Sequence, residues 1–558
     1  MKLVECVPNF SEGRDRDKIN AITREIESTP GVKLLDVDPG ESTNRTVVTF
    51  IGTPEGVEEA AFKAVKKAAE LLDMRTQKGA HSRIGATDVV PFVPVSGVTM
   101  ADCVRIAHAL AARVARDLGI PVYLYEEAAQ KPERKNLAII RAGEYEGLEE
   151  KLKDQTWVPD YGEPVFNPKS GATVVGAREF LIAYNINLNT SDRKLANEIA
   201  LNLRESGRAK RDKEGNVVRD EAGQSVKIPG RFRDVRAVGW YIEDYGIAQI
   251  SINFTNYKVT PPHLVFDEAV RAAEKLGLRV TGSELVGLIP KEAMLMAGRY
   301  YLEKQGKSPG APEKELIQIA VRSLGLSDVV PFEPQKKIIE YQFCEEGKSL
   351  LPLSVQEFVD ELSMDSATPG GGSACALCGA LSAALSAMVA NLTVGKKGYE
   401  GREAEMKTCA RKAQALKDEL LRAVDLDTRA FDKVMEAYRL PKTTEDQKTE
   451  KDLAVEEALK GATLVPFEVL KKCADLVDLA QTVALHGNKN SLSDAGVAGL
   501  MAQVCAEGAY FNVRINLPNM QDKQFKARIK REATALKRKI SQAASSVKEI
   551  VEKEFNQK

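Results

Sequence analysis

One histidine is a candidate for proton transfer. The chain has 558 residues and only four histidines, and His81 lies in the segment from Lys78 to Gly85, KGAHSRIG. An imidazole gains and loses a proton near neutral pH, so a scarce histidine between glycines and beside an arginine suits acid–base chemistry. A hydrogen-bonded loop histidine is the alternative that this segment leaves open.

Charged residues that could assist such a histidine occur around a Pro-Gly pair. Asp38 precedes Pro39-Gly40, and Arg45 begins the next apolar run. The Asp38 carboxylate could orient an imidazole, or it could only form the turn before Pro-Gly. Arg45 and Arg83 carry planar guanidinium groups that suit carboxylates, and either could equally be a structural ion-pair partner.

A second loop has the composition of a ligand-binding segment. It is rich in glycine and proline but carries one aromatic and one lysine, so it could lie against a flat ring system with an acidic tail, or merely link two domains. Its residues are Gly162, Glu163, Pro164, Val165, Phe166, Asn167, Pro168, Lys169, Ser170 and Gly171.

The second half of the chain offers a different kind of site. Gly370, Gly371 and Gly372 precede an uncharged helical stretch, so backbone amides at a helix N-terminus face a place with little side chain, which suits an anion or a flat ligand. Further along a predicted helix, Asp425 and Asp427 point in different directions, so at most one faces an apolar interior. A buried carboxylate would have a raised pKa and could donate a proton near neutral pH; two solvated acids are the alternative.

These residues need elements to position them, and the first half of the chain alternates strand and helix patterns. Strands are predicted over 3–10, 32–38, 45–51 and 122–125, with helices over 16–27, 57–72 and 101–118. A similar order recurs in strands over 180–187, 235–242, 248–254 and 278–281, with helices over 194–204, 264–276 and 291–303. Two split βαβ units side by side, each a ferredoxin-like α/β sandwich, are the simplest arrangement, and the groove between them is a common place for a ligand.

Beyond residue 330 the pattern becomes helical. Helices are predicted over 354–362, 373–392, 401–438, 447–486, 493–511 and 522–553, which indicates an all-α bundle. We therefore expect a multidomain chain with subdomains at 1–178 and 179–330, a linker at 331–352 and a helical domain at 353–558.

Composition excludes several classes of protein. The formal net charge of -1 argues against a dedicated nucleic-acid binder, which would show a basic excess. The uncharged stretch 366–395 is rich in Ala, Gly and Ser, so we expect close helix packing rather than a membrane span. Eight dispersed cysteines and the lack of an apolar signal segment predict a cytoplasmic protein, and Cys375 with Cys378 lacks a second pair for a zinc site, so no metal is expected.

Several segments carry a family resemblance. The first half resembles glutamate formimidoyltransferase, and the second half resembles formimidoyltetrahydrofolate cyclodeaminase; both occur in the order of the bifunctional formimidoyltransferase-cyclodeaminase family. The matching segments are Cys6 to Gly13, Ser42 to Thr46, the His81 segment, Arg141 to Glu146, Val286 to Pro290, Thr368 to Ser373, Asp425 to Phe431, Arg439 to Lys442 and Ala509 to Val513.

The resemblance implies a histidine-degrading, folate-dependent enzyme. The first half would transfer the formimidoyl group of N-formimidoyl-L-glutamate to tetrahydrofolate, a co-substrate expected to be polyglutamylated, and the second would form 5,10-methenyltetrahydrofolate with loss of ammonia. The resemblance assigns catalysis to His81, Asp38 and Asp427, and it also implies a homo-oligomer joined through the helical domain. Substrate or folate binding is expected of Asn9, Arg45, Arg83, the loop from Gly162 to Gly171, Gly370, Gly371 and Gly372.

Two other functions remain open at this point. The helical half could be a methenyltetrahydrofolate cyclohydrolase, which ammonia release would distinguish. The chain could also be a folate-binding scaffold without turnover, although a scaffold has no need for acid–base groups such as His81, Asp38 and Asp427.

Overall fold

The structure, a computed structural model, describes residues 2–41, 44–79, 82–220, 223–243, 245–342 and 349–556. The chain divides into two compact units. The first comprises Met1–Ala297 and Val321–Glu345, and the second comprises Gly298–Ala320 and Glu346–Lys558. A sheet-containing α/β region followed by an all-helical region confirms the coarse architecture expected from the sequence.

The first unit begins with a seven-stranded mixed sheet. Its strands follow the order β1-β4-β2-β5-β7-β6, with β3 paired to β4, and only the β5–β7 and β6–β7 pairs are parallel. The strands are β1 (Leu3–Cys6), β2 (Asn9–Phe10), β3 (Val32–Gly40), β4 (Arg45–Gly52), β5 (Thr87–Ser96), β6 (Val122–Glu126) and β7 (Thr173–Ala177).

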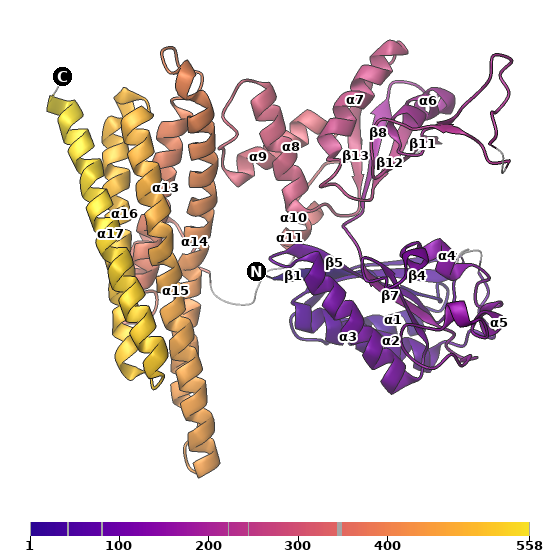
Figure 1. Ribbon diagram of the computed structural model, residues 1–558, viewed down its shortest axis with the longest axis horizontal. Coiled ribbons are helices and arrows are strands. Elements are labelled where there is room, and N and C mark those ends of the chain that lie inside the picture. The colour runs from indigo at the N-terminus through magenta and orange to yellow at the C-terminus, as the bar shows by residue number, and fades with distance from the viewer. Residues whose placement is uncertain are drawn as a thin grey trace. The chain divides into compact units, whose positions relative to one another are not determined.

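Helices cover the first sheet on one side. Figure 1 shows α1 (Arg16–Glu27), α2 (Pro54–Leu71) and α3 (Met100–Leu118) along this face, where alternate strand residues such as Phe50 and Phe92 join their apolar stripes in one core. The short helices α4 (Leu137–Arg141) and α5 (Leu148–Lys151) contribute Ile140 and Leu148 to a smaller core with Val89, Tyr123 and Val174. These two short helices cover only part of the second face of the sheet, so the rest of that face is available for a site.

The second sheet is antiparallel, in the order β11-β12-β8-β13, with helices in the crossovers. Its strands are β8 (Ile182–Leu188), β11 (Val235–Ile242), β12 (Ile247–Phe254) and β13 (Val280–Val286), and its helices are α6 (Arg193–Leu203) and α7 (Pro262–Lys275). The stretch between α6 and β11 carries the small antiparallel pair β9 (Arg208–Ala209) and β10 (Lys227–Ile228). Four further helices follow: α8 (Lys291–Lys304), α9 (Glu313–Leu324), α10 (Pro334–Lys337) and α11 (Ile339–Gln342).

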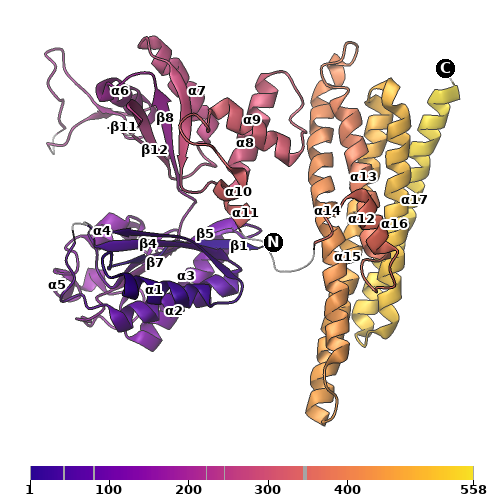
Figure 2. The ribbon, with the colours of Figure 1, turned by 180° about the vertical axis from the view of Figure 1, so that it is seen from behind.

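The second unit is built around long helices that share one apolar core. They are α12 (Val355–Leu362), α13 (Gly371–Asn391), α14 (Glu403–Arg439), α15 (Glu445–His486), α16 (Leu492–Asn516) and α17 (Lys523–Asn556). Figure 2 shows α13 beside α14 and α16, the two helices with which it makes most of its contacts. A Cβ atom at Gly379 would lie 2.8 Å from the Cys505 Sγ, so small residues on α13 permit this close approach.

Helix α13 is long and apolar enough to cross a membrane by length and composition, the one such helix in the described part of the chain. However, 61% of its apolar 18-residue stretch is buried inside the bundle. The core helix of a bundle has the same properties, which agrees with the close helix packing predicted from its Ala, Gly and Ser content.

Candidate active sites

The residues on both sides of His81 are tied to the β3–β4 hairpin. His81 itself, with Ala80, lies outside the described residues. The Asn44 side chain donates from Nδ2 to the Lys78 carbonyl oxygen at 3.0 Å, and the Gln77 amide donates to the Asn44 carbonyl at 2.9 Å. Gln77 also accepts from Arg83 Nε at 2.8 Å. The His81 segment is thus anchored next to the hairpin that carries Asp38 and Arg45.

Asp38 and Arg45 lie near the hairpin end of two paired strands. Asp38 pairs with Val47 in the sheet, and Arg45 pairs with Gly40. Strand β3 therefore continues through Asp38 to Gly40, so Asp38 is not the residue that forms the turn. Its carboxylate is exposed. Burial lowers the pKa of Arg45 and the Arg141 charge lowers it further, whereas Asp88 and Asp38 act in the opposite direction. Arg45 is therefore surrounded by charges of both signs.

A buried ion pair lies behind this group. The Asp88 side chain is fully buried, and its carboxylate forms an ion pair with Arg141. Asp88 also accepts a hydrogen bond from the Ile84 backbone N–H at 3.1 Å. Because an unpaired buried charge is costly, this pair fixes the backbone three residues after His81.

Arg83 is held by two glutamates. Its guanidinium contacts Glu144 at 2.9 Å and Glu146 at 2.7 Å, and only 7% of the side chain is exposed. Hydrogen bonds to Glu146 are the largest cause of its raised pKa. The geometry favours the structural ion-pair alternative for Arg83, which then shapes the His81 segment rather than presenting a free fork to substrate.

Asn9 lies in the middle of the first sheet. Strand β2 places it opposite Val47 of β4 and Val89 of β5. Its side chain is 7% exposed and donates from Nδ2 to the Val7 carbonyl at 2.9 Å. Asn9 is therefore close in the sheet to the strands that carry Arg45 and Asp88.

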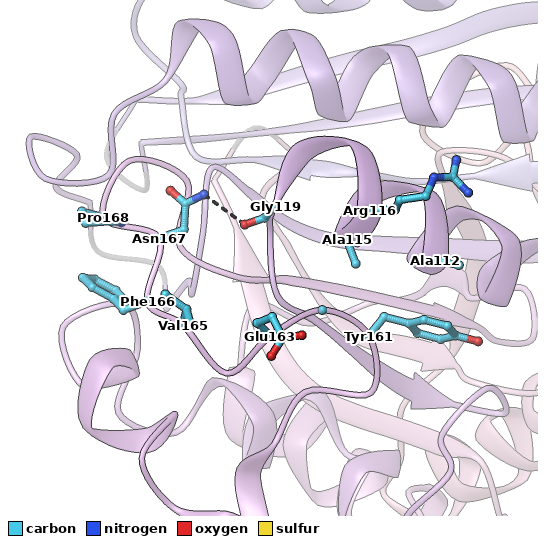
Figure 3. A pocket seen from close by; sticks show the side chains of 11 residues that line it. Ala112, Ala115, Arg116, Gly119, Tyr161, Glu163, Val165, Phe166, Asn167 and Pro168 are labelled. Atoms are coloured by element: carbon cyan, nitrogen blue, oxygen red, sulfur yellow. Dashed lines mark hydrogen bonds between the residues drawn. The ribbon is translucent and has the colours of Figure 1, made fainter.

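Part of the loop from Gly162 to Gly171 lines a cavity, namely Gly162, Glu163 and residues 165–168. The cavity has a volume of ≈ 690 Å³, and Figure 3 shows Glu163, Val165 and Phe166 across from the C-terminal turns of α3. Helix α3 contributes Ala112, Ala115 and Arg116 to the wall. The wall holds an aromatic ring and a carboxylate, a composition that suits a ligand site, whereas the guanidinium of Arg116 is bonded to Asp117.

The end of this loop joins the His81 segment. The Ser170 carbonyl accepts from the Ala86 N–H at 2.9 Å, and Gly85 forms a bridge with Gly171. A Cβ atom at Gly171, whose φ is +66°, would lie 2.2 Å from the Ile84 oxygen, so the contact requires glycine. The Gly162–Gly171 loop and the His81 segment, which the sequence presented as two separate candidates, therefore lie in contact.

A further cavity lies between the two sheets of the first unit. It has a volume of ≈ 610 Å³, and its walls include Glu5 and Arg178 together with Lys336 and Lys337. Burial raises the pKa of Glu5 to about 7, although the Arg178 charge opposes that shift. We expected a groove between two adjoining sandwiches. The sequence did not predict that a buried glutamate would line it.

In the second unit, Asp427 lies against the glycine-rich start of α13. Gly370 caps this helix, and a Cβ atom at Gly372 would lie 2.1 Å and 2.2 Å from the two Asp427 carboxylate oxygens. Only a glycine leaves room for this carboxylate. Burial raises the Asp427 pKa, and hydrogen bonds from Ser373 partly oppose this effect. Asp427 is therefore a half-buried acid whose pKa is shifted toward the protonated form.

Asp425, two residues earlier on α14, has another role. Its carboxylate accepts from the Leu350 N–H at 2.8 Å and from the Ser349 hydroxyl at 2.6 Å. These bonds attach the segment that precedes α12 to the bundle. The structure thus separates two acids that helical spacing alone left equivalent.

Several residues around these sites escaped sequence reasoning. Asp88 and Glu5 each lie within a run of apolar residues. A carboxylate in such a run is the sequence signal that could have predicted a buried acid. Arg141 and Asn512 are brought to their sites by contacts across more than 50 residues of chain, which spacing does not reveal. Among the described residues, no group of three or more His, Cys, Asp or Glu side chains could hold a metal ion.

The chain is similar to three models of known domains. Residues 3–178 match the formiminotransferase domain, N-terminal subdomain, and residues 183–344 match the formiminotransferase domain. Residues 354–535 match formiminotransferase-cyclodeaminase.

Known proteins match either the whole chain or one half. The formimidoyltransferase-cyclodeaminase of Mus musculus is 45% identical over 548 residues, 98% of both chains. The glutamate formimidoyltransferase of Thermoplasma acidophilum is 43% identical over 312 residues, 56% of this chain and 95% of its own. The methenyltetrahydrofolate cyclohydrolase of Methylorubrum extorquens is 43% identical over 172 residues, 31% of this chain and 83% of its own. Because similarity extends along both halves in the same order, this chain belongs to the formimidoyltransferase-cyclodeaminase family.

Proposed function

We propose that this chain catalyses two successive folate reactions of histidine degradation. It transfers the formimidoyl group of N-formimidoyl-L-glutamate to tetrahydrofolate and then converts 5-formimidoyltetrahydrofolate to 5,10-methenyltetrahydrofolate and ammonia. The observation that carries this proposal is the 45% identity to a formimidoyltransferase-cyclodeaminase over 98% of both chains. Each half also retains an acid–base candidate, His81 in the first and Asp427 in the second.

The first reaction requires a proton to move twice. Folate N5 attacks the formimidoyl carbon, and His81 accepts the N5 proton. His81 then returns this proton to the glutamate nitrogen, and the bond between that nitrogen and the formimidoyl carbon breaks. We assign Asp38 to orienting the imidazole, as its place beside the anchored His81 segment supports. The Gly162–Gly171 loop would hold the folate, and Asn9 and Arg45 would contact the substrates.

The second reaction closes a ring and expels ammonia. Folate N10 attacks the formimidoyl carbon, and the N10 proton passes to the imino nitrogen. The bond between that carbon and nitrogen breaks when the nitrogen receives a second proton, so it leaves as ammonia. Asp427 is the proposed donor, because desolvation raises its pKa and so favours the protonated acid. The amides of the α13 first turn, at Gly370, Gly371 and Gly372, would face the folate.

The cyclohydrolase alternative has its own support. A methenyltetrahydrofolate cyclohydrolase is 43% identical to this chain over 172 residues, 83% of its own length. Such an enzyme would consume the methenyl product and release no ammonia. A formimidoyltransferase half on the same chain favours the cyclodeaminase, since it supplies 5-formimidoyltetrahydrofolate.

Several finer properties belong to the same proposal. The folate would be polyglutamylated, no metal would be needed for two proton-transfer steps, and the enzyme would be cytoplasmic, as seven free cysteines in the described residues suit. A ferredoxin-like core in each sheet is supported by the strand orders β11-β12-β8-β13 and β3-β4-β1-β5, each from a βαββαβ segment.

Self-association through the helical half is also proposed. Helix α13 exposes Leu381 and Met388, with Leu392 at its C-cap, and α16 exposes Val497, Leu500 and Val504, at spacings that place each set on one helix face. Exposed apolar stripes of this kind are typical of an interface between copies. Replacing Leu500 with Glu should shift full-length protein toward monomer in sedimentation, and an unchanged oligomer would exclude the α16 stripe.

The experiment for the proposed function is an assay of the purified protein with N-formimidoyl-glutamate and tetrahydrofolate. Glutamate, ammonia and the methenyl chromophore should appear in equal amounts. Glutamate without ammonia would contradict the cyclodeaminase half, and binding of folate without any product would indicate the scaffold.

A further inference from the structure

The cavity between the two sheets of the first unit, which we call the Glu5 cavity, encloses a carboxyl group without a partner. Glu5 lines this ≈ 610 Å³ cavity from β1 and is 5% exposed. Among the described residues, none forms a hydrogen bond with its carboxyl. Leaving a buried polar group unpaired is costly, so a buried carboxyl that faces a cavity suits a ligand with which it can form a hydrogen bond.

The wall of the Glu5 cavity carries an excess of positive charge. Its cationic groups are Arg178 and two lysines of α10, Lys336 and Lys337, and the described wall holds one acid besides Glu5, namely Asp36. Lys336 already forms an ion pair with a glutamate at 2.9 Å. Arg178 uses N–H groups on a backbone carbonyl and on a tyrosine hydroxyl, but a guanidinium has five, so others remain for an anion.

Apolar side chains make up much of the remaining wall. They include Phe180, Leu181 and Leu288. A cavity of this size, with an apolar lining and a few polar groups that converge, is typical of a site for a small organic molecule. The ligand that fits both parts of the wall is a carboxylate attached to an apolar chain or ring.

The Glu5 cavity adjoins residues assigned to the transfer reaction. On the first sheet Asp36 pairs with Thr49, and both line the cavity. Asp38 pairs with Val47, two residues further along the same strands. Side chains two residues apart on a strand lie on the same face, about 7 Å from each other. The cavity therefore begins on the face of the sheet that carries Asp38.

We propose that the Glu5 cavity binds a glutamyl carboxylate of a substrate of the transfer reaction. The protonated Glu5 carboxyl donates a hydrogen bond to this carboxylate, and Arg178 forms an ion pair with it. An ionised Glu5 has no proton to donate, and its charge repels the ligand. Binding therefore requires the protonated acid, and a molecule whose Glu5 is ionised takes up a proton from solvent when it binds.

Both proposed substrates contain such a carboxylate. N-formimidoyl-L-glutamate is itself a glutamyl compound, and tetrahydrofolate ends in a p-aminobenzoyl-glutamate group. The inference rests on the proposed transfer reaction, since it takes its ligand from that reaction. Binding measured without tetrahydrofolate reports on the cavity alone, whereas glutamate release in the presence of tetrahydrofolate reports on the function.

The test is a calorimetric titration of the full-length protein at pH 6, 7 and 8. The probes are N-formimidoyl-L-glutamate and p-aminobenzoyl-L-glutamate, whose carboxylates stay ionised over this range. Burial raises the Glu5 pKa to about 7, although the Arg178 charge opposes this shift. The protonated share of Glu5 therefore falls from about nine-tenths at pH 6 to about one-tenth at pH 8, and the affinity for the probe that occupies the cavity should fall about tenfold.

Glu5→Gln should remove this dependence, because an amide N–H donates at every pH. At pH 7 the wild type should also take up about half a proton per bound probe, measured by repeating the titration in buffers with different heats of ionisation. Glu5→Gln should take up almost none. Arg178→Gln should weaken binding of the same probe by about tenfold or more at pH 6.

Glu58→Gln is the matched control. Glu58 lies on α2 and is half-buried, and burial raises its pKa as well, but it is not part of the cavity wall. This variant should keep the pH dependence and the proton uptake of the wild type.

Equal affinity of the wild type at pH 6 and pH 8 for both probes, or the full wild-type dependence in Glu5→Gln, would overturn the inference. So would a failure of both probes to bind. Should Glu5→Gln not fold, proton uptake by the wild type and the affinity of Arg178→Gln decide. Wild-type protein that binds a probe as expected but releases no glutamate with tetrahydrofolate would instead refute the proposed function.

Discussion

The acidity of an aspartate on α14 depends on what packs against it. Asp427 lies on Gly372 and loses water, which raises its pKa. Asp425 instead accepts hydrogen bonds from Ser349 and Leu350, which anchor the chain before α12. Replacing Asp427 should therefore affect catalysis, whereas replacing Asp425 should affect stability.

Asp427→Asn should lower ammonia release by about 10²- to 10⁴-fold, because an amide cannot deliver an acidic proton. Transfer should continue, so 5-formimidoyltetrahydrofolate should accumulate. Asp425→Asn should instead lower the midpoint of thermal unfolding and keep most activity in the folded fraction. Wild-type ammonia release by Asp427→Asn would exclude it as the donor and return attention to Asp425.

Glu5 predicts a pH dependence of stability. Its pKa is raised from 4.5 to about 7 by burial, so the folded state holds a proton that the unfolded state loses at lower pH. The stabilisation from Glu5 is complete below pH 4.5 and disappears as the pH rises through about 7. Compared with Glu5→Gln, the wild type should lose about 3 kcal/mol of unfolding free energy over this window.

Calorimetry of both proteins between pH 4 and 8 would measure this difference. A difference that stays constant with pH would show that Glu5 keeps its ordinary acidity in the folded protein.

The identity of the functional residues could be predicted from the sequence better than the contacts that they make. His81, Asp38 and Asp427 were reached from residue type and resemblance, and their catalytic roles stay predictions. The Asp88–Arg141 pair and the place of Asn512 could not be predicted, because each depends on contacts between distant segments. The Arg83 ion pairs show the same limit, since spacing left its role open.

At the scale of elements, periodicity predicted most helices and strands of both halves. Helix α1 and strand β11 have the predicted bounds, and all six predicted helices of the second unit are present. Strand β5 was missed because it contains Pro91 and Pro94, which normally disfavour a central strand. It is nevertheless central, because it pairs with β1 and β2 on one side and with β7 on the other.

The first turn of α13 should not tolerate any side chain at Gly372. In Gly372→Ala, the new methyl group would meet the Asp427 carboxylate and displace it. Ammonia release should fall by about tenfold or more, as expected when a general acid is misplaced. Steady-state assays of both activities would show the loss confined to the second reaction.

Gly461→Ala provides the comparison. This glycine lies inside α15 with no atom within 4 Å of an added Cβ. The alanine should raise stability by about 1 kcal/mol through helix propensity and leave activity unchanged. Equal activity in Gly372→Ala and Gly461→Ala would contradict the tight packing at Gly372.

At the scale of the whole molecule, the two candidate sites belong to different compact units. His81 falls within the residue range of the first unit, and Asp427 falls within that of the second. The sequence indicated this division through the change from mixed to purely helical periodicity. It could not place the helices α8 and α9, whose residues Gly298–Ala320 are grouped with the second unit.

Separate sites make the two activities separable. His81→Ala should lose transfer by about 10²- to 10⁴-fold, the usual cost of removing a general base, and should keep ammonia release from supplied 5-formimidoyltetrahydrofolate. This is the opposite of the pattern expected for Asp427→Asn.

The most direct test of two sites in succession is a complementation assay on these two variants. Each is given N-formimidoyl-glutamate and tetrahydrofolate, alone and in an equimolar mixture, and the methenyl chromophore is followed together with ammonia. Each variant alone should form almost no methenyltetrahydrofolate, and the mixture should form it, because the intermediate made by Asp427→Asn is consumed by His81→Ala. A His81→Ala variant that also fails to release ammonia from supplied 5-formimidoyltetrahydrofolate, or an Asp427→Asn variant that makes methenyltetrahydrofolate alone, would contradict the account.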